Sequence, residues 1–226
     1  MVAEMTLDFY QIYFQDEQKD KLYPFAIPYK NEKFSLLFEN DVIKDLVPES
    51  KADLISVCSW RLAQKRGEGA SEAILKRNGT FALTEEKILS SDFDIAILTP
   101  RNHKDIVEKL ILWHGPAARE ALDVLNTFIR IPNVVEHAIY ENHFIAKKEI
   151  YQDYVRTVLI PAIEFMRERW EIFGKDSGYI TKKKDQKEIE AYQKASGRKD
   201  WPLMPFILER LFCIWANKKG FKYINL

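Results

Sequence analysis

The sequence has few cysteines, no long apolar run and no excess of charge of either sign. Lys and Arg together number 34, and Asp and Glu together also number 34, so the formal net charge is zero. A protein that binds along a nucleic acid needs a surplus of positive charge to neutralise the phosphates. Nucleic acid is therefore not expected as the main partner.

Long apolar segments are absent as well. The longest uninterrupted runs, such as residues 211–216, span about six residues, against the roughly 18 to 20 needed to cross a bilayer. The first eight residues lack the basic stretch followed by an apolar stretch that marks a signal peptide. We therefore expect no transmembrane segment and a cytoplasmic location, with peripheral attachment to the inner face of the membrane as an alternative.

The two cysteines, Cys58 and Cys213, lie far apart in the sequence, and each is part of an apolar run. This pattern indicates two buried thiols, and neither a disulfide framework nor a paired metal site is expected. None of the four histidines pairs with another at the spacing that places two metal ligands on one helix face, so a zinc site is not expected.

Several common catalytic motifs are also missing. The sequence contains no G-x-x-x-x-G-K-[ST] loop, no G-x-G-x-x-G turn, no G-x-S-x-G elbow and no H-E-x-x-H helix. These absences remove the commonest nucleotide triphosphatase, dinucleotide-binding, hydrolase and zinc-protease sites.

What the sequence does contain is an alternation of short apolar strands with helical patterns. With 226 residues, 46% of them hydrophobic, the chain can form one large core. Strands are predicted at residues 8–14, 53–58, 94–98, 144–146 and 223–226, and helices at residues 34–47, 103–130, 148–169 and 206–218. Strands separated by helices predict an α/β fold with a mixed, partly parallel sheet flanked by helices, in which residues 53–58 form the central strand.

Proline and glycine mark the expected ends and breaks of the helices. Pro48 should end the first helix, Gly115-Pro116 should divide the second, and Pro161 should kink the third. Residues 182–196 are polar with a helical pattern, which predicts a solvated excursion from a single domain that spans residues 1–226.

Three segments carry a resemblance to a known family. The strand that ends in Ser-Trp-Arg at residues 59–61 resembles the part of bacterial capsular and exopolysaccharide synthesis glycosyltransferases in which an acidic helix precedes a strand ending in His-Tyr-Arg-Arg. Residues 140–154 are similar to the family's Tyr-Asn-Met-Phe-Ile-Met-Lys-Lys-Glu stretch, with the closest match at Phe-Ile (144–145) and Lys-Lys-Glu (147–149). Glu-Arg-Leu at residues 209–211 stands where the family's terminal helix has the same triplet before an aromatic residue.

The resemblance covers residues 38 to 226, with two departures: Ser59 stands in place of the histidine, and Leu62 stands in place of the second arginine. It implies a divergent member with a Rossmann-like glycosyltransferase type A scaffold. It also implies transfer of a sugar from a nucleotide-sugar donor to a surface-polysaccharide or lipid-linked acceptor. The alternative is a non-catalytic glycosyltransferase-like protein that binds a carbohydrate or a partner subunit.

The leaving diphosphate of such a donor must be neutralised by Arg and Lys or by a divalent ion. Trp60 and Arg61 follow the central strand, where ligands bind in open α/β sheets, and we assign them to donor binding. Tyr10 and Tyr13 of the first strand are assigned to stacking on the nucleobase, although aromatic residues in strands are mostly core residues.

Glu141 and His143 are the predicted catalytic residues. They offer a carboxylate and an imidazole that could remove a proton from an acceptor hydroxyl. The alternative is a polar turn or edge-strand cluster without a catalytic role.

Two further pairs complete the predicted site. Asp92 and Asp94 form the D-x-D pattern that many such enzymes use for Mn²⁺ or Mg²⁺. They precede their strand, whereas a metal-holding pair would follow one, so the alternative is a helix-to-strand loop. Glu209 and Arg210 lie inside an apolar helix, where they would neutralise one another as a structural or orienting ion pair.

Overall fold

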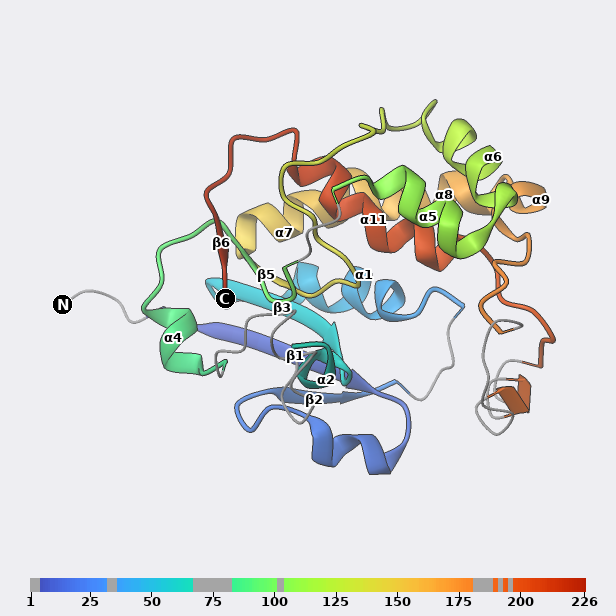
Figure 1. Cartoon of the computed structure of the whole chain (residues 1–226). Coiled ribbons are helices and arrows are strands. Elements are labelled where there is room, and N and C mark those ends of the chain that lie inside the picture. The colour runs from blue at the N-terminus through green and yellow to red at the C-terminus, as the bar shows by residue number, and fades with distance from the viewer. Residues whose placement is uncertain are drawn as a thin grey trace.

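The computed structural model describes residues 5–31, 36–66, 83–100, 104–180, 189–190, 193–194 and 197–226. In these residues six strands form one mixed sheet in the order β2-β1-β3-β5-β4-β6 (Figure 1). The strands are β1 (Leu7–Tyr13), β2 (Ile27–Lys30), β3 (Leu54–Ser59), β4 (Ile95–Ile97), β5 (Phe144–Lys147) and β6 (Tyr223–Asn225). β5 runs antiparallel to both of its neighbours, β3 and β4, whereas the other pairings are parallel.

The helices flank this sheet. They are η1 (Asp16–Lys21), α1 (Glu39–Glu49), α2 (Leu62–Arg66), α4 (Glu85–Leu89), α5 (Ile106–His114), α6 (Pro116–Leu125), α7 (Lys148–Tyr154), the π-helical η2 (Val155–Leu159), α8 (Ile160–Arg167), α9 (Trp170–Phe173) and α11 (Met204–Ala216). The predicted α/β class with a partly parallel sheet is confirmed. None of the helices in the described residues is long and apolar enough to cross a membrane.

The sheet has a hydrophobic core on each face, which explains why β3 is apolar in both directions. Ile55 and Val57 belong to the larger core, under α1, α7, α8 and α11. Leu54 and Cys58 belong to the smaller core, together with residues of α2 and α4. Both cysteines are free and buried, as predicted.

Most predicted breaks appear in the structure. Gly115 has a φ of 78° and separates α5 from α6. Pro161 lies near the start of α8, directly after the π-helical turn η2, so the long helix changes its hydrogen-bonding pattern there. Pro48 lies inside the last turn of α1, one residue before the helix ends. Most of the predicted excursion at residues 182–196 lies outside the described residues, and its described parts, 189–190 and 193–194, are helical.

The ends of the strands form two opposite sides of the sheet, which we call its carboxyl edge and its amino edge. Neither name refers to the outer strands β2 and β6. β1, β3 and β4 end at one edge, here called the carboxyl edge, and β5 begins at it. The opposite edge is called the amino edge. α1 runs from the carboxyl edge to the amino edge, because Ser50 at its end donates a 2.6 Å hydrogen bond to Asp8 at the start of β1. Ligands of open α/β sheets bind beyond the carboxyl ends of the strands.

Candidate functional site

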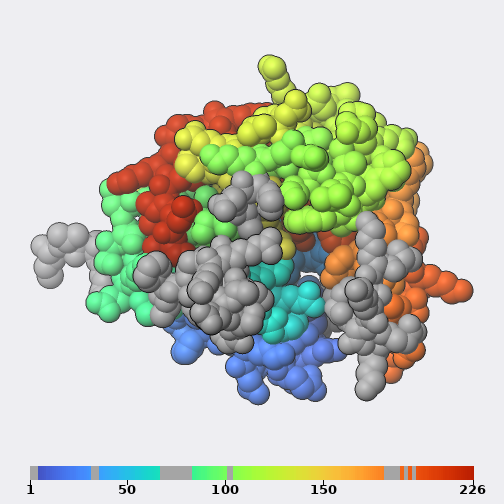
Figure 2. Space-filling model, viewed as in Figure 1, coloured from blue at the N-terminus to red at the C-terminus, as the bar shows by residue number. Residues whose placement is uncertain are grey.

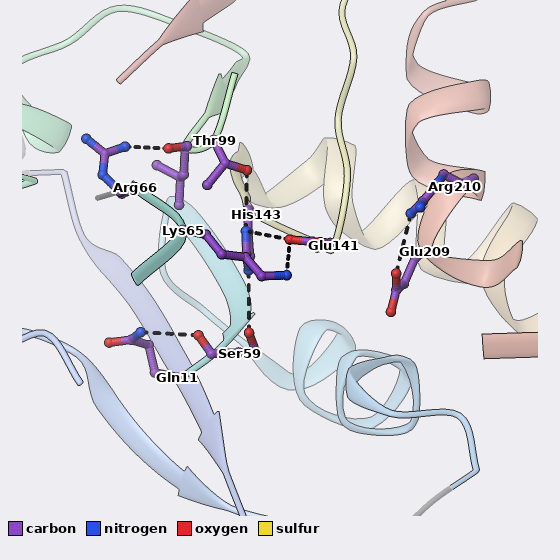
Figure 3. Close-up of polar contacts among 10 residues, drawn as sticks. Gln11, Ser59, Lys65, Arg66, Thr99, Glu141, His143, Glu209 and Arg210 are labelled. Atoms are coloured by element: carbon purple, nitrogen blue, oxygen red, sulfur yellow. Dashed lines mark hydrogen bonds and ion pairs between the residues drawn. The ribbon is translucent and has the colours of Figure 1, made fainter. Parts of the chain in front are cut away.

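His143 lies at the carboxyl edge, immediately before β5, and its side chain is 0% exposed. Its Nε2 atom is 3.5 Å from the Ser59 hydroxyl at the end of β3, and its Nδ1 atom is 3.3 Å from the hydroxyl of Thr99, which follows β4. The same Nδ1 atom is 3.6 Å from a carboxylate oxygen of Glu141. The imidazole therefore joins three chain segments through both of its nitrogens (Figure 3).

Glu141 is the more exposed member of the predicted catalytic pair. Its side chain is 26% exposed and forms an ion pair with Lys65 of α2, the helix that follows β3. The sequence predicts His143 as a proton acceptor for a substrate, and that role stays a prediction. The geometry places His143 beneath the surface and leaves Glu141 as the member of the pair that reaches solvent.

The turn that carries both residues has unusual backbone geometry. Glu141 and Asn142 have φ values of 61° and 56°, in the left-handed region. Asn tolerates this conformation, but for Glu it is uncommon and costs energy, and such strain clusters at functional sites. The turn is closed by hydrogen bonds from His143 N to Tyr140 O and from Phe144 N to Asn142 O, both 3.1 Å. This tight turn directs the side chains of Glu141 and His143 toward one another.

Two further carboxylates, those of Glu39 and Glu209, interact electrostatically with Glu141. Glu39 begins α1, directly after Phe38, whose φ of 52° is also left-handed. Glu209 lies on α11. We call Glu39, Glu141 and Glu209 the acidic group, because the charge of Glu141 raises the pKa of Glu39, and the charges of Glu39 and Glu141 raise that of Glu209.

Burial shapes the protonation of the acidic group. Desolvation raises the pKa of Glu209 to about 8, although neighbouring Arg210 lowers it, and the charges of Glu39 and Glu141 raise it further. Desolvation also raises the pKa of Glu39, against its own backbone N–H and Lys65, which lower it. Perturbed carboxylates of this kind are typical of functional sites.

A second cluster surrounds the half-buried ring of Trp60, just past β3. The Lys21 ammonium lies 4.9 Å and the Arg61 guanidinium carbon 5.2 Å from the centre of this ring. The backbone N–H of Trp60 donates a 2.9 Å hydrogen bond to Ile12 O, which fixes the start of the loop. We call Lys21, Trp60 and Arg61 the Trp60 platform. It presents two cations at the carboxyl edge, held near one aromatic ring.

The platform lies beside the acidic group. The Arg61 charge acts on Glu39, and Lys65, from the helix that follows Arg61, binds Glu141. In the space-filling view, the surface beside the cyan atoms of the β3–α2 segment is hollowed toward the blue atoms of α1 (Figure 2). The structure thus brings Trp60, Arg61, Glu141 and His143 to one edge of the sheet. It adds Lys21, Glu39 and Lys65, which no local motif in the sequence marks as site residues.

The two tyrosines assigned to nucleobase stacking lie in different places: Tyr10 is in the middle of β1, and Tyr13 ends β1 at the carboxyl edge. The Tyr10 hydroxyl donates a 3.5 Å hydrogen bond to Asp8, so its side chain turns toward the amino edge. Tyr13 is 8% exposed at the end of β1. The assignment of both tyrosines to nucleobase stacking stays a prediction.

Asp92 and Asp94 lie at the amino edge, on the far side of the sheet from His143. Asp94 accepts a 2.8 Å hydrogen bond from the Lys147 ammonium and a 2.9 Å bond from the Lys222 N–H. Asp92 pairs with the Lys222 ammonium. These lysines lower the pKa of both carboxyls. Because both oxygens of Asp94 and one oxygen of Asp92 are engaged by Lys147 and Lys222, the two carboxylates are poorly suited to hold Mn²⁺ or Mg²⁺ together. In the described residues no group of three or more His, Cys, Asp and Glu side chains is arranged to hold a metal ion.

The Glu209–Arg210 pair forms as an ion pair of 3.4 Å, in which the Arg210 side chain is 3% and the Glu209 side chain 12% exposed. The Arg210 guanidinium carbon lies 4.6 Å from the ring centre of Tyr140 and 5.6 Å from that of Trp113. Arg210 is therefore held by aromatic rings as well as by Glu209, and it connects α11 to the residue before Glu141.

Comparisons with known proteins leave this site without a family: no protein-family model matches the chain, and searches of curated proteins and of solved structures found no match.

Proposed function

We propose that this chain is a glycosyltransferase on a Rossmann-like type A scaffold, which moves a sugar from a nucleotide-sugar donor to a surface-polysaccharide or lipid-linked acceptor. The observation that carries the proposal is the pairing of two clusters at one edge of the sheet. The Trp60 platform offers cations, and the acidic group beside it offers carboxylates. Sugar transfer from a nucleotide sugar can use cations to stabilise the leaving diphosphate and a carboxylate to accept the proton of the acceptor hydroxyl.

The cations of the Trp60 platform can stabilise the leaving group. A nucleoside diphosphate leaves with negative charge that must be stabilised as the bond to the sugar breaks. Arg61 can grip two phosphate oxygens with its planar guanidinium, and Lys21 adds a second positive charge near the same indole ring. The platform therefore supplies charge stabilisation from side chains of this chain alone.

The carboxylates of the acidic group can bind the sugars. Carboxylates accept hydrogen bonds from sugar hydroxyls, and one that is unprotonated can take up the proton that an acceptor hydroxyl loses. Glu141 is held in place by Lys65 and by the buried His143, which fixes its direction before a substrate arrives.

Asp92 and Asp94 have no role in this proposal. Their lysine partners, and their position at the amino edge, separate them from the Trp60 platform. We propose instead that donor binding rests mainly on Lys21 and Arg61.

Calorimetric titration with UDP, GDP, CDP and their sugar esters tests the proposal. The protein should bind one of these nucleotides, and Arg61→Ala should weaken that binding tenfold or more, since a charge-assisted contact to phosphate is lost. Arg156→Ala is the matched control, because Arg156 is an 81% exposed arginine of η2. The proposal fails if no nucleotide binds, or if both variants bind alike. A non-catalytic binding protein would bind sugar ligands without turnover.

A second candidate function follows from the order Ser59–His143–Glu141. Hydroxyl, imidazole and carboxylate are arranged along one line of contacts, at 3.5 Å and 3.6 Å, as in a nucleophilic triad. A fluorophosphonate probe would label Ser59 in a serine hydrolase of this kind. The transferase proposal expects no labelling, and labelling that Ser59→Ala abolishes would favour the hydrolase.

A further inference from the structure

α11 is buried along its whole length except at one residue. Every residue of this helix from Met204 to Ala216 is buried apart from Glu209. A helix that is apolar all round normally lies inside the core, and a carboxylate there is costly. The one residue of α11 that is not fully buried is therefore also its one carboxylate, with 12% of its side chain exposed.

Arg210 neutralises this carboxylate only in part. The guanidinium contacts Glu209 at 3.4 Å, but it also lies over the ring of Tyr140 and is almost completely buried. The pKa of Glu209, raised by burial, stays at about 8 in spite of Arg210. Arg210 is thus anchored in the structure, and Glu209 is the less buried member of the ion pair that Figure 3 draws.

The other charged groups around Glu209 come from several elements. Glu39 of α1 and Glu141 of the turn before β5 repel its negative charge, and Lys65 of α2 attracts it. α5 contributes His114, which is engaged elsewhere, since its Nδ1 atom is 3.1 Å from Ser177 O. The charged residues of η2 and α8 are on their exposed sides, as Arg156, Glu164 and Arg167 are.

The two other members of the acidic group have structural partners. Glu141 is bound by Lys65 and contacts His143. Glu39 begins α1, where its carboxylate accepts a hydrogen bond from its own backbone N–H. Within the described residues, Glu209 is paired with its neighbour in sequence, Arg210, and with no residue of another element, so it is the member best able to exchange a proton with a ligand.

We propose that Glu209 is the general base of the transfer, a role that rests on the proposed function. In this step the Glu209 carboxylate takes the proton of the acceptor hydroxyl, and the acceptor oxygen forms a bond to the anomeric carbon of the donor sugar. The bond from that carbon to the diphosphate oxygen breaks, and its electron pair leaves with the nucleoside diphosphate beside Arg61 and Lys21. Glu141 then acts as a positioning residue on the acceptor side.

Substitution of Glu209 by Gln tests the role in turnover. Gln keeps the shape of the side chain but cannot accept the proton, so turnover should fall by about 10²- to 10⁴-fold. Nucleotide affinity should stay within twofold of the parent, because Glu209 does not contact the donor phosphates in this proposal. Glu164→Gln, at an exposed position of α8, is the matched control and should leave both quantities unchanged.

The pH dependence adds a readout that a merely structural role would not move. With the pKa of Glu209 at about 8, log(kcat/KM) should rise with unit slope below pH 8 and level off above it, as the carboxylate loses its proton. Glu209→Gln should lose this limb, and Glu209→Asp should retain it with lower activity. A parent profile that is flat between pH 6 and 8, or equal turnover of Glu209→Gln and the parent, overturns the proposal.

A measurement without substrate separates this inference from the proposed function. In protein labelled with carbon-13 at glutamate carboxyls, one resonance should titrate near pH 8, and Glu209→Gln should remove it while Glu164→Gln does not. If Glu209 titrates near its ordinary pKa, the base assignment falls and nucleotide binding is unaffected. If Glu209 titrates near pH 8 but no nucleotide binds, the proposed function falls and takes the base assignment with it.

Discussion

The carboxyl groups at the two edges of the sheet differ in whether their surroundings lower or raise their pKa values. At the amino edge, Asp53, Asp92 and Asp94 have pKa values lowered by hydrogen bonds and lysine partners. At the carboxyl edge, the pKa values of Glu39 and Glu209 are raised, with burial as the largest cause. The amino edge favours the ionised form and so contributes to stability. At the carboxyl edge, the burial of Glu39 and Glu209 costs stability when they are ionised, and such a cost is typical of functional sites.

Backbone strain also distinguishes the carboxyl edge from the amino edge. In the described residues, the non-glycine positions with left-handed φ values are Phe38, Glu141 and Asn142, and Glu141 belongs to the acidic group while Phe38 precedes Glu39. Strain of this kind persists only where the surrounding structure enforces it. The comparison therefore predicts that the two edges differ in the size of their response to mutation and in the sign of their response to pH.

The largest effect on stability is expected for His143→Ala. This change removes a fully buried ring and leaves the hydroxyls of Ser59 and Thr99 without their partner, so the free energy of unfolding should fall by about 2–4 kcal/mol. Urea denaturation followed by circular dichroism measures it. Asp94→Asn at the amino edge is the control and should cost no more than about 1 kcal/mol. Equal losses in the two variants would show that the buried contacts of His143 contribute no more to stability than the contacts of Asp94.

The pH dependence of stability should have opposite signs at the two edges. Glu209 has a folded-state pKa of about 8 against an ordinary value of 4.5, so its contribution is present at low pH and is lost as the pH rises from 4.5 to 8. The lowered pKa of Asp94 gives a contribution that is present above its ordinary pKa and is lost as the pH falls.

Chemical denaturation from pH 4 to 9 separates these contributions. Between pH 5 and 8, the stability of the parent should fall relative to that of Glu209→Gln, and the difference should be constant above pH 8. Parallel curves for the two proteins across this range would show that Glu209 titrates as an ordinary carboxyl.

Part of the fold could be predicted from the sequence, and part could not. The strands were predictable where one short segment carries the pattern, as in β3. The antiparallel direction of β5 was not, because pairing with β3 and β4 depends on contacts between distant segments.

The same limit applies to the site. Trp60, Arg61, Glu141 and His143 stand in segments with a recognisable sequence pattern, and the structure places them at one edge. Lys21 and Lys65 lie in ordinary charged stretches, and only the fold brings Lys21 to the ring of Trp60 and Lys65 to Glu141. The burial that raises the pKa of Glu209 is likewise a tertiary property.

Metal dependence should be small. With Asp92 and Asp94 occupied by lysines, addition of EDTA should weaken nucleotide binding less than tenfold, or about 1.4 kcal/mol. Calorimetric titration with and without the chelator measures this change. A larger loss that Asp94→Asn reproduces would place a metal at the amino edge and contradict the assignment of the two edges.

The smallest effect is expected for Lys222→Ala at the amino edge. The Lys222 ammonium contacts Asp92, whose side chain is 83% exposed, and surface ion pairs contribute little in water. The Tm should move by about 1–2 °C at most in a thermal melt. A greater shift would indicate that the amino edge depends on this pair.

The central claim is that the carboxyl edge binds a nucleoside diphosphate, and a crystal soaked with the nucleotide that titrates best tests it most directly. We predict electron density for the diphosphate within hydrogen-bonding distance of the Arg61 guanidinium and the Lys21 ammonium, on the side of the sheet that carries Glu141. Density at Asp92 and Asp94, or an empty carboxyl edge in a crystal where the nucleotide is bound elsewhere, would contradict it.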